Sequence, residues 1–333
     1  NDIIINSILV INFIMKILFI DSYPNTDFRI SKDQNGGYGT ANNYGDSLFG
    51  KFLKFYVKES IDFPPLYAVQ TIGELINSGH EVKFVKNFKS LNNINEYDFF
   101  IITSSIVCHE TEIMAIKELI KYKKSIFSIG PFATSNSQNY INAGAKVISG
   151  EPEMFFYKFN LSLDELNSLP NLINNFKIID INALSMPGWE VIFKLYTPKF
   201  KFLGNEPAVN INASRGCPYS CFYYCVYPLQ QGRKLRLKNP DKLINEIKYL
   251  QRTLNISNFI FRDPVFSIDK KHTMQICKKI ISEELNINIC IETHLKNIDE
   301  ELSNYFKKAG VKLIYVGIES SNENVKKTNN RWS

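Results

Sequence analysis

The pattern of apolar and polar residues divides the chain into two regions in which strands and helices alternate. In the first region, short continuous apolar runs are separated by segments with an apolar residue every three or four positions. The runs are typical of strands buried on both faces and the segments of amphipathic helices. The predicted strands cover residues 16–20, 81–85, 98–103, 125–129 and 146–148. The predicted helices cover residues 65–78, 110–122 and a short stretch near 138. This order predicts a parallel, doubly wound α/β sheet over residues 15–151.

Residues 152–206 interrupt the alternation. Pro170, Pro187 and Pro198 lie there among polar and aromatic clusters. Because proline breaks regular elements, we expect a linker with little regular structure.

The alternation resumes after residue 206 in four strand–helix units. The predicted strands cover 208–213, 258–262, 287–292 and 312–317, and the helices 240–253, 271–284 and 299–309. Repeated βα units predict a barrel or part of one, with functional groups at the carboxyl ends of the strands.

Composition narrows the class of protein. The chain has 333 residues, 44% of them hydrophobic and 22% charged, which is typical of a folded protein with two domains. The net charge of +6 is spread over lysines that alternate with acids, so a nucleic-acid partner is disfavoured. We expect a cytoplasmic protein, since six cysteines in a chain this long indicate a reducing compartment.

The first twenty residues are mostly apolar but do not have the pattern of a membrane anchor or signal peptide. Asn6, Asn12 and Lys16 interrupt the run, and no cationic segment precedes it. Because the chain begins with Asn, we expect residues 1–14 to be an upstream extension and Met15 to be the natural start.

Three cysteines within nine residues are the strongest chemical signal. Cys217, Cys221 and Cys225 follow a predicted strand directly, so their thiols can converge on one ion or cluster. A cubane [4Fe–4S] cluster held by three cysteines keeps one iron open for another ligand. Zinc remains the alternative, although it would ordinarily require a fourth Cys or His nearby.

The other cysteines are expected to be structural. Cys277 falls on the apolar face of a helix and Cys290 inside a strand, where a free cysteine behaves as a small hydrophobe. Cys108 and His109 are adjacent, but one thiol and one imidazole do not make a metal site.

Around these cysteines the chain resembles the radical S-adenosylmethionine superfamily, in the branch where a cobalamin-binding-like domain precedes the radical domain. The matching segments are Arg215-Gly-Cys-Pro-Tyr-Ser-Cys221, Pro228 with Gly232-Arg233 and Arg236, Asn239-Pro240, Phe261–Phe266, Ile298–Leu302, Lys308–Gly310, Gly317–Ser320 and Leu184–Trp189. The resemblance implies a flavodoxin-like first domain and a radical SAM barrel, which usually has six strands. Because the chain ends after four predicted strands, we expect a partial, truncated barrel over residues 207–333, with an exposed edge at 312–317.

The same resemblance implies an enzyme. Cys217, Cys221 and Cys225 would hold a [4Fe–4S] cluster whose open iron chelates S-adenosylmethionine, and reduction would cleave it to methionine and a 5′-deoxyadenosyl radical. The electron would come from a donor such as flavodoxin or ferredoxin. The expected reaction is methyl transfer or rearrangement on a small-molecule substrate.

The resemblance also implies the residues that contact S-adenosylmethionine. Tyr224 would lie near the adenine, while Asp263, Glu292, Glu319 and Ser320 follow three successive strands and would bind the amino group or the ribose. The alternatives are a turn cap for Asp263 and a helix N-terminal acid for Glu319.

Two positions depart from the family pattern. The family usually has three and then two residues between its cysteines, whereas Phe222, Tyr223 and Tyr224 place three in the second gap. We expect the extra residue to bulge outward and leave the sulfur atoms roughly 6 to 7 Å apart or less. His294 stands where many relatives have arginine.

The first domain is a candidate for binding cobalamin. In relatives with a histidine lower ligand, the loop after the first strand reads Asp-x-His-x-x-Gly, but here Tyr23 and Thr26 replace the histidine and glycine. Cobalamin without a histidine ligand could still bind at Thr103–Ser105 and Gly130–Thr134. The alternative is a scaffold domain without a cofactor. The loop from Lys32 to Gly50 is expected to be a mobile surface segment.

Two further functions remain open. One is a non-catalytic iron–sulfur or scaffold protein that keeps the fold. The other is methylthio transfer to RNA, which would require an RNA-binding domain not visible in this sequence.

Overall fold

The computed structural model describes residues 14–174, 176–219, 221, 225–318, 321, 322 and 324. Its first sheet has six parallel strands in the order β5-β1-β6-β7-β8-β9. They are β1 (Lys16–Ile20), β5 (Glu81–Val85), β6 (Phe99–Thr103), β7 (Ile126–Ile129), β8 (Lys146–Ile148) and β9 (Leu172–Ile173). The chain passes from β1 to β5 on one side and then to β6 on the other, so the strand order reverses between β1 and β6.

Helices cover both faces of this sheet. Successive residues of β1 pack into different apolar clusters, Ile17 and Phe19 into one and Leu18 and Ile20 into the other. The helices are α2 (Leu66–Asn77), α3 (His109–Leu119), α4 (Pro131–Ser135), α5 (Ser137–Ala143), α6 (Pro152–Phe155) and α7 (Leu163–Ser168). The parallel doubly wound arrangement predicted from the apolar runs is confirmed.

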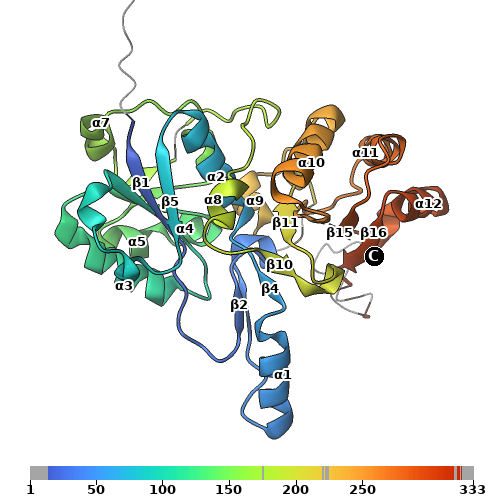
Figure 1. Cartoon of the computed structure of the whole chain (residues 1–333), viewed down its shortest axis with the longest axis horizontal. Helices are drawn as coiled ribbons and strands as arrows, with labels where there is room; N and C mark the ends of the chain where they lie inside the picture. The colour runs from blue at the N-terminus through green and yellow to red at the C-terminus, as the bar shows by residue number, and fades with distance from the viewer. Residues whose placement is uncertain are drawn as a thin grey trace, which may run out of the picture.

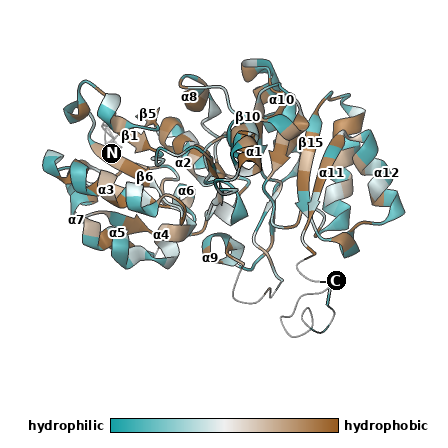
Figure 2. Ribbon diagram, turned by 90° about the horizontal axis from the view of Figure 1, so that it is seen from below, coloured by the Kyte–Doolittle hydropathy of each residue, from teal (hydrophilic) through white to brown (hydrophobic). Residues whose placement is uncertain are grey.

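The second sheet is open and has four parallel strands in the order β11-β14-β15-β16. Helices line its outer side, at the opposite end of the molecule from α3 and α5 (Figures 1 and 2). The elements are β11 (Ala208–Ile211), α10 (Pro240–Leu254), β14 (Asn258–Phe261), α11 (Lys270–Ser282), β15 (Asn288–Thr293), α12 (Glu300–Lys308) and β16 (Val311–Val316). Among the described strands β16 pairs with β15 alone, and Ile314 and Tyr315 on it are 41% and 45% exposed.

The segment between the two sheets has more regular structure than predicted. It contains α6, α7 and β9, then α8 (Trp189–Phe193) and β10 (Lys199–Phe200). The strand β9 extends the first sheet, and β10 pairs with β4 (Ile61–Asp62). Short 3-10 turns lie at η2 (Phe88–Ser90), η3 (Ile94–Glu96), η4 (Ile120–Tyr122), η5 (Lys201–Leu203) and η6 (Leu295–Asn297).

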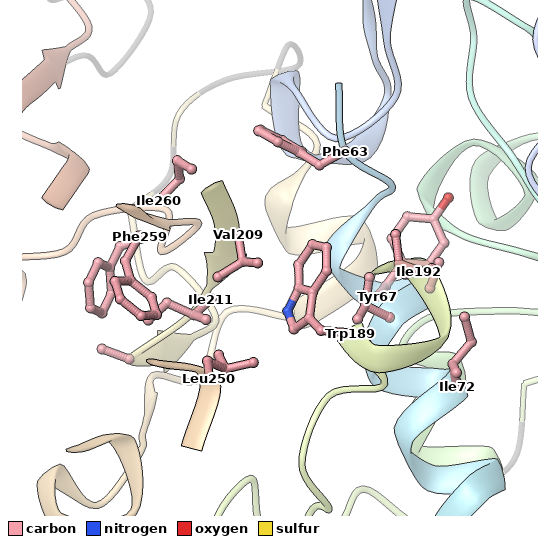
Figure 3. Close-up of a cluster of buried hydrophobic side chains, with 14 of the residues drawn as sticks. Phe63, Tyr67, Ile72, Trp189, Ile192, Val209, Ile211, Leu250, Phe259 and Ile260 are labelled. Carbon is pink, nitrogen blue, oxygen red and sulfur yellow. The ribbon is translucent and has the colours of Figure 1, made fainter. Parts of the chain in front are cut away.

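A shared apolar core joins the two sheets. Trp189 is fully buried between Val209 and Ile211 of β11 on one side and Tyr67 and Ile192 on the other (Figure 3). One continuous apolar cluster therefore includes strands of both domains. Because close-packed interiors resist deformation, this core fixes the carboxyl edges of the two sheets relative to each other.

A long insertion follows β1. It contains β2 (Arg29–Ser31), η1 (Asn35–Gly37), β3 (Thr40–Asn42) and α1 (Leu48–Lys58). The helix α1 projects away from both sheets (Figure 1). The expectation of a surface loop from Lys32 is wrong for the start of this segment, because Lys32 and Asp33 are 0% and 6% exposed and form ion pairs. None of the described helices combines the length and apolar character needed to cross a membrane.

Candidate functional site

The loop that carries the three cysteines is anchored by a small hairpin. After β11 the chain forms β12 (Ser214–Arg215), which pairs antiparallel with β13 (Arg236–Leu237), and α9 (Tyr227–Gln231) lies between them. The backbone N–H of Cys217 donates to the carbonyl oxygen of Gly232 (3.2 Å), and that of Gly216 donates to Gln231 Oε1 (3.1 Å). The first cysteine therefore leaves the hairpin in a fixed direction.

Gly216 is required by the geometry of this hairpin. Its φ of +82° is disfavoured for any residue with a Cβ, and a Cβ there would lie 2.1 Å from the carbonyl oxygen of Lys234. The neighbouring atom is backbone, so the contact cannot be relieved by a side-chain rotation.

Replacing Gly216 with Ala should therefore displace Cys217 and lower the iron content after anaerobic reconstitution several-fold. The matched control is Gly79→Ala, since Gly79 has a similar φ of +89° but no atom within 4 Å of the added Cβ. The control should lose only about 1 kcal/mol in the free energy of unfolding, because alanine disfavours a positive φ. Its iron content should equal that of the wild type. Equal iron content in the two variants would contradict the assigned role of Gly216.

The three cysteines line a single cavity of about 150 Å³. Burial raises the pKa of Cys217, and the charges of Cys225 and Cys221 raise it further. Among the described residues, no group of three or more His, Cys, Asp or Glu side chains is arranged around a single metal ion. Three thiols around one cavity are the donor set that a cubane cluster with one open iron requires.

A second part of the cavity wall comes from the carboxyl ends of β14, β15 and β16. The lining residues from these ends are Pro264, Val265, Glu292, Thr293, His294 and Gly317. The hydroxyl of Tyr227, which also lines the cavity, donates to Glu292 Oε2 (3.4 Å). Desolvation and the nearby Glu292 charge raise the pKa of Tyr227 well above its usual range, so this hydroxyl remains a neutral donor.

Asp263 is placed differently from Glu292. It is fully buried and is absent from the cavity lining. Its carboxylate accepts hydrogen bonds from the backbone N–H of Ala213 (3.0 Å) and from Ser214 Oγ (2.6 Å). Asp263 thus ties the end of β14 to the start of the cysteine hairpin.

Several predicted features lie outside the described residues. They are Tyr224, Glu319, Ser320 and the expected outward bulge at Phe222 and Tyr223. Cys277 and Cys290 are described, are buried in the core and do not line the cavity. Burial raises the pKa of each of these two thiols to about 12, which leaves them protonated near neutral pH.

An aromatic and amide wall was not anticipated from the sequence. Tyr219 lies 5.9 Å from the His294 ring, centroid to centroid, and its hydroxyl accepts from Asn297 Nδ2 (3.2 Å). Arg233 Nη1 donates to the carbonyl oxygen of Tyr219 (2.9 Å). A residue of the first domain, Asn35, also lines the cavity. These contacts join segments far apart in the sequence, and no local pattern marks them.

Arg215 links the cysteine hairpin to the first domain. Its guanidinium is buried and lies 2.6 Å from Glu151 Oε1 and 2.5 Å from Glu153 Oε1, while Arg236 lies 2.8 Å from Glu151 Oε2. Gln70 of α2 accepts a further hydrogen bond from Arg215. The run Gly150-Glu-Pro-Glu153, one residue after β8, was the available sequence signal for these carboxylates. Buried arginine–carboxylate networks of this kind hold two surfaces in one register.

Comparison with known proteins gives a family match for the second domain. Residues 211–333 match the Radical SAM superfamily. The anaerobic magnesium-protoporphyrin IX monomethyl ester cyclase of Synechocystis sp. is 32% identical over 140 residues, which is 41% of this chain and 27% of that protein. An uncharacterized methyltransferase of the same organism is 25% identical over 279 residues, which is 80% of this chain and 49% of that protein. The chain thus spans about half or less of the length of these relatives.

A solved structure shares the fold over nearly the whole chain. The radical S-adenosylmethionine methyltransferase TsrM of Kitasatospora setae, with tryptophan and a SAM analogue bound, superposes with a TM-score of 0.63 at 12% identity. The match covers 96% of this chain and 63% of TsrM. A second TsrM structure, with cobalamin and a [4Fe–4S] cluster bound, has a TM-score of 0.62.

Proposed function

Since this chain carries a radical SAM domain over residues 211–333, we propose that the protein is a radical S-adenosylmethionine enzyme. Cys217, Cys221 and Cys225 would hold its [4Fe–4S] cluster. The observation that carries the proposal is the single cavity that these three side chains line at the carboxyl ends of the second sheet. Three protein thiolates leave one iron of a cubane open for S-adenosylmethionine.

The proposed architecture follows the same family. The first domain, residues 15–151, is a flavodoxin-like sheet, and its strand order and switch point support this assignment. Residues 152–206 connect it to residues 207–333, which form the first four strand–helix units of a radical SAM barrel. The four parallel strands with helices on the outer side support that second assignment.

The residues of the chain have distinct proposed roles. When bound, the cluster supplies the electron that cleaves S-adenosylmethionine to methionine and a 5′-deoxyadenosyl radical. Glu292 accepts a hydrogen bond from the amino group of S-adenosylmethionine, and the neutral hydroxyl of Tyr227 orients the Glu292 carboxylate. Tyr224 is assigned to the adenine, and Glu319 and Ser320 to the ribose or amino group, on the basis of the family pattern.

Asp263 and Arg215 are positioning residues in this scheme. Asp263 fixes the start of the cysteine hairpin through Ala213 and Ser214, and Arg215 fixes its base against the first domain. Neither side chain lines the cysteine cavity. We therefore propose that both act on cluster geometry and not on S-adenosylmethionine itself.

The comparisons support methyl transfer as one reaction class within this proposal. A methyltransferase shares the fold and was solved with cobalamin and a cluster bound. One relative is a cyclase, so rearrangement of a small molecule is the other proposed reaction class. Either class requires an electron donor of the flavodoxin or ferredoxin type.

Anaerobic reconstitution tests the proposal. The protein should cleave S-adenosylmethionine under dithionite, and the product to measure is 5′-deoxyadenosine. Glu292→Gln should keep the cluster but slow cleavage by about 10-fold or more, as expected when one charge-assisted contact worth 1.4 kcal/mol or more is lost. The control Glu283→Gln changes an exposed acid of the outer helices and should cleave at the wild-type rate. A wild-type cluster that never cleaves S-adenosylmethionine would instead support the non-catalytic iron–sulfur protein.

A further inference from the structure

The carboxyl edge of the first sheet is filled by Lys32, a residue of the chain's own insertion. Sheets of this kind bind ligands in the crevice at the point where the strand order reverses, here between β1 and β6. The Lys32 side chain has no exposed surface. Its Nζ lies 3.2 Å from Asp21 Oδ1, just after β1, and donates to Thr103 Oγ1 at the end of β6 (3.0 Å). The crevice therefore already holds a side chain.

Lys32 is held there by a buried ion-pair network. Its Nζ lies 2.7 Å from Glu112 Oε1 of α3, and Glu112 Oε2 accepts from the Tyr140 hydroxyl (2.6 Å) and the backbone N–H of Ser105 (3.2 Å). Burial by itself lowers the pKa of Lys32, but the Glu112 and Asp21 carboxylates more than offset this and raise it above its usual value. A charge withdrawn from water is tolerated only when its partners are fixed. Lys32 is thus a permanent part of the interior.

The backbone segments expected to contact cobalamin are covered as well. The carbonyl oxygen of Tyr38 accepts from the backbone N–H of Ile106 (3.0 Å), and the Tyr38 ring packs edge-on against Phe132 at 5.7 Å between centroids. The hydroxyl of Tyr67 donates to the carbonyl oxygen of Ser104 (3.0 Å). Both segments, at the ends of β6 and β7, consequently lie beneath the insertion and α2.

The insertion continues from this edge to the cysteine domain. Asp33 forms an ion pair with Arg262 and accepts from Asn210 Nδ2 (2.6 Å), and both partners belong to the second domain. At Gly36, with a φ of +62°, an added Cβ would lie 2.7 Å from Val226 Cγ2, one residue after Cys225. The insertion therefore bridges the two carboxyl edges by direct contact.

The cavity that opens onto this part of the insertion is too small for a cofactor. The cavity there is lined by Asp33, Tyr67, Arg215, Tyr227 and Arg262 among others, and its volume is about 40 Å³. Roughly 10–15 Å³ of such volume is enough for one water molecule, so this cavity has room for only a few. Pockets for drug-sized molecules start at about 300 Å³, and a corrinoid is larger still.

We infer that residues 29–42 form an interdomain wedge that takes the place of cobalamin in this chain. Tyr23, which stands where some relatives have the histidine ligand of cobalamin, supports this inference. Its ring lies under Lys32, with 5.0 Å between Nζ and the ring centroid. This inference rests on the proposed function, because it assumes that the cysteine domain carries out radical S-adenosylmethionine chemistry. It adds that the chemistry proceeds without a corrinoid methyl carrier. Asn35 of the wedge lines the cysteine cavity, so the wedge supplies part of that cavity's wall.

Cobalamin titration of the reconstituted chain tests this inference. Hydroxocobalamin is added up to about 100 µM, at which a site of micromolar affinity is nearly full, and the cobalamin retained after gel filtration is measured by its absorbance. We expect no saturable retention and no shift of the thermal unfolding midpoint, because only a ligand that binds the folded state stabilises it. TsrM, which was solved with cobalamin bound, serves as the positive control.

Saturable retention of cobalamin by this chain would overturn the inference. Iron content is measured in the same samples, which separates the two proposals. A chain that takes up neither cluster nor cobalamin contradicts the proposed function and leaves the wedge supported. A chain that takes up both contradicts the wedge and supports cobalamin-dependent chemistry.

Discussion

Replacing Cys217, Cys221 or Cys225 with Ala, one at a time, should remove the iron–sulfur cluster. The three side chains line one cavity, and a cubane with only two protein thiolates loses a ligand that nothing else in that loop supplies in the same position. Wild-type protein should contain about four iron and four sulfide per chain after anaerobic reconstitution, with absorbance near about 400 nm. Each variant should lose most of both, and S-adenosylmethionine cleavage should fall to background.

Cys277→Ala is the matched control for this experiment. Cys277 is buried in the core, and its pKa of about 12 keeps the thiol protonated. Its loss should cost only packing, about 1 kcal/mol in the free energy of unfolding, and should leave iron content unchanged. A cluster that survives Cys225→Ala but is lost in Cys277→Ala would require a different set of ligands.

The strands could be predicted from the sequence because their burial is local and continuous. Every residue of Phe99–Thr103 is apolar or small and is buried, as the unbroken run indicated. The placement of the cysteine loop at the carboxyl edge followed from the strand before it, and Glu292 likewise lies in the cavity because β15 ends there. These features depend on chain order and on the parallel arrangement of βα units.

The contents of the crevice could not be predicted, because they depend on charges far apart in the chain. Lys32 is eleven residues from Asp21 but eighty from Glu112, and only the fold brings the three together. Read locally, the Gly- and Asn-rich stretch after Lys32 is typical of a surface loop. The role of Asp263 could not be predicted from its position either. A carboxylate directly after a strand could contact a cofactor or hold the chain in place, and its hydrogen bonds to Ala213 and Ser214 give it the second role.

Replacing Lys32 with Met should destabilise the protein strongly. Methionine keeps most of the side-chain volume but leaves Asp21 and Glu112 buried without a cation. Removing one partner of a buried ion pair typically costs about 3–5 kcal/mol, which urea unfolding can measure. The control Lys270→Met removes an exposed lysine that pairs with Asp299 and Glu301, and should change stability little.

The loss in Lys32→Met should also depend on pH in a direction that the wedge fixes. Burial raises the pKa of Glu112 even beside Lys32, and removing the ammonium raises it further. A buried carboxyl whose pKa is higher in the folded than in the unfolded protein lowers the free energy of unfolding once the pH exceeds its unfolded-state pKa of about 4.3. The reason is that the unfolded chain then releases the proton while the folded chain still holds it. The stability gap between wild type and Lys32→Met should therefore be small near pH 4 and widen towards neutral pH, whereas Lys270→Met, which loses only an exposed pair, should widen far less. A gap that stays constant across this range would mean that Lys32 acts only by filling space, and that the crevice is not closed by paired charges.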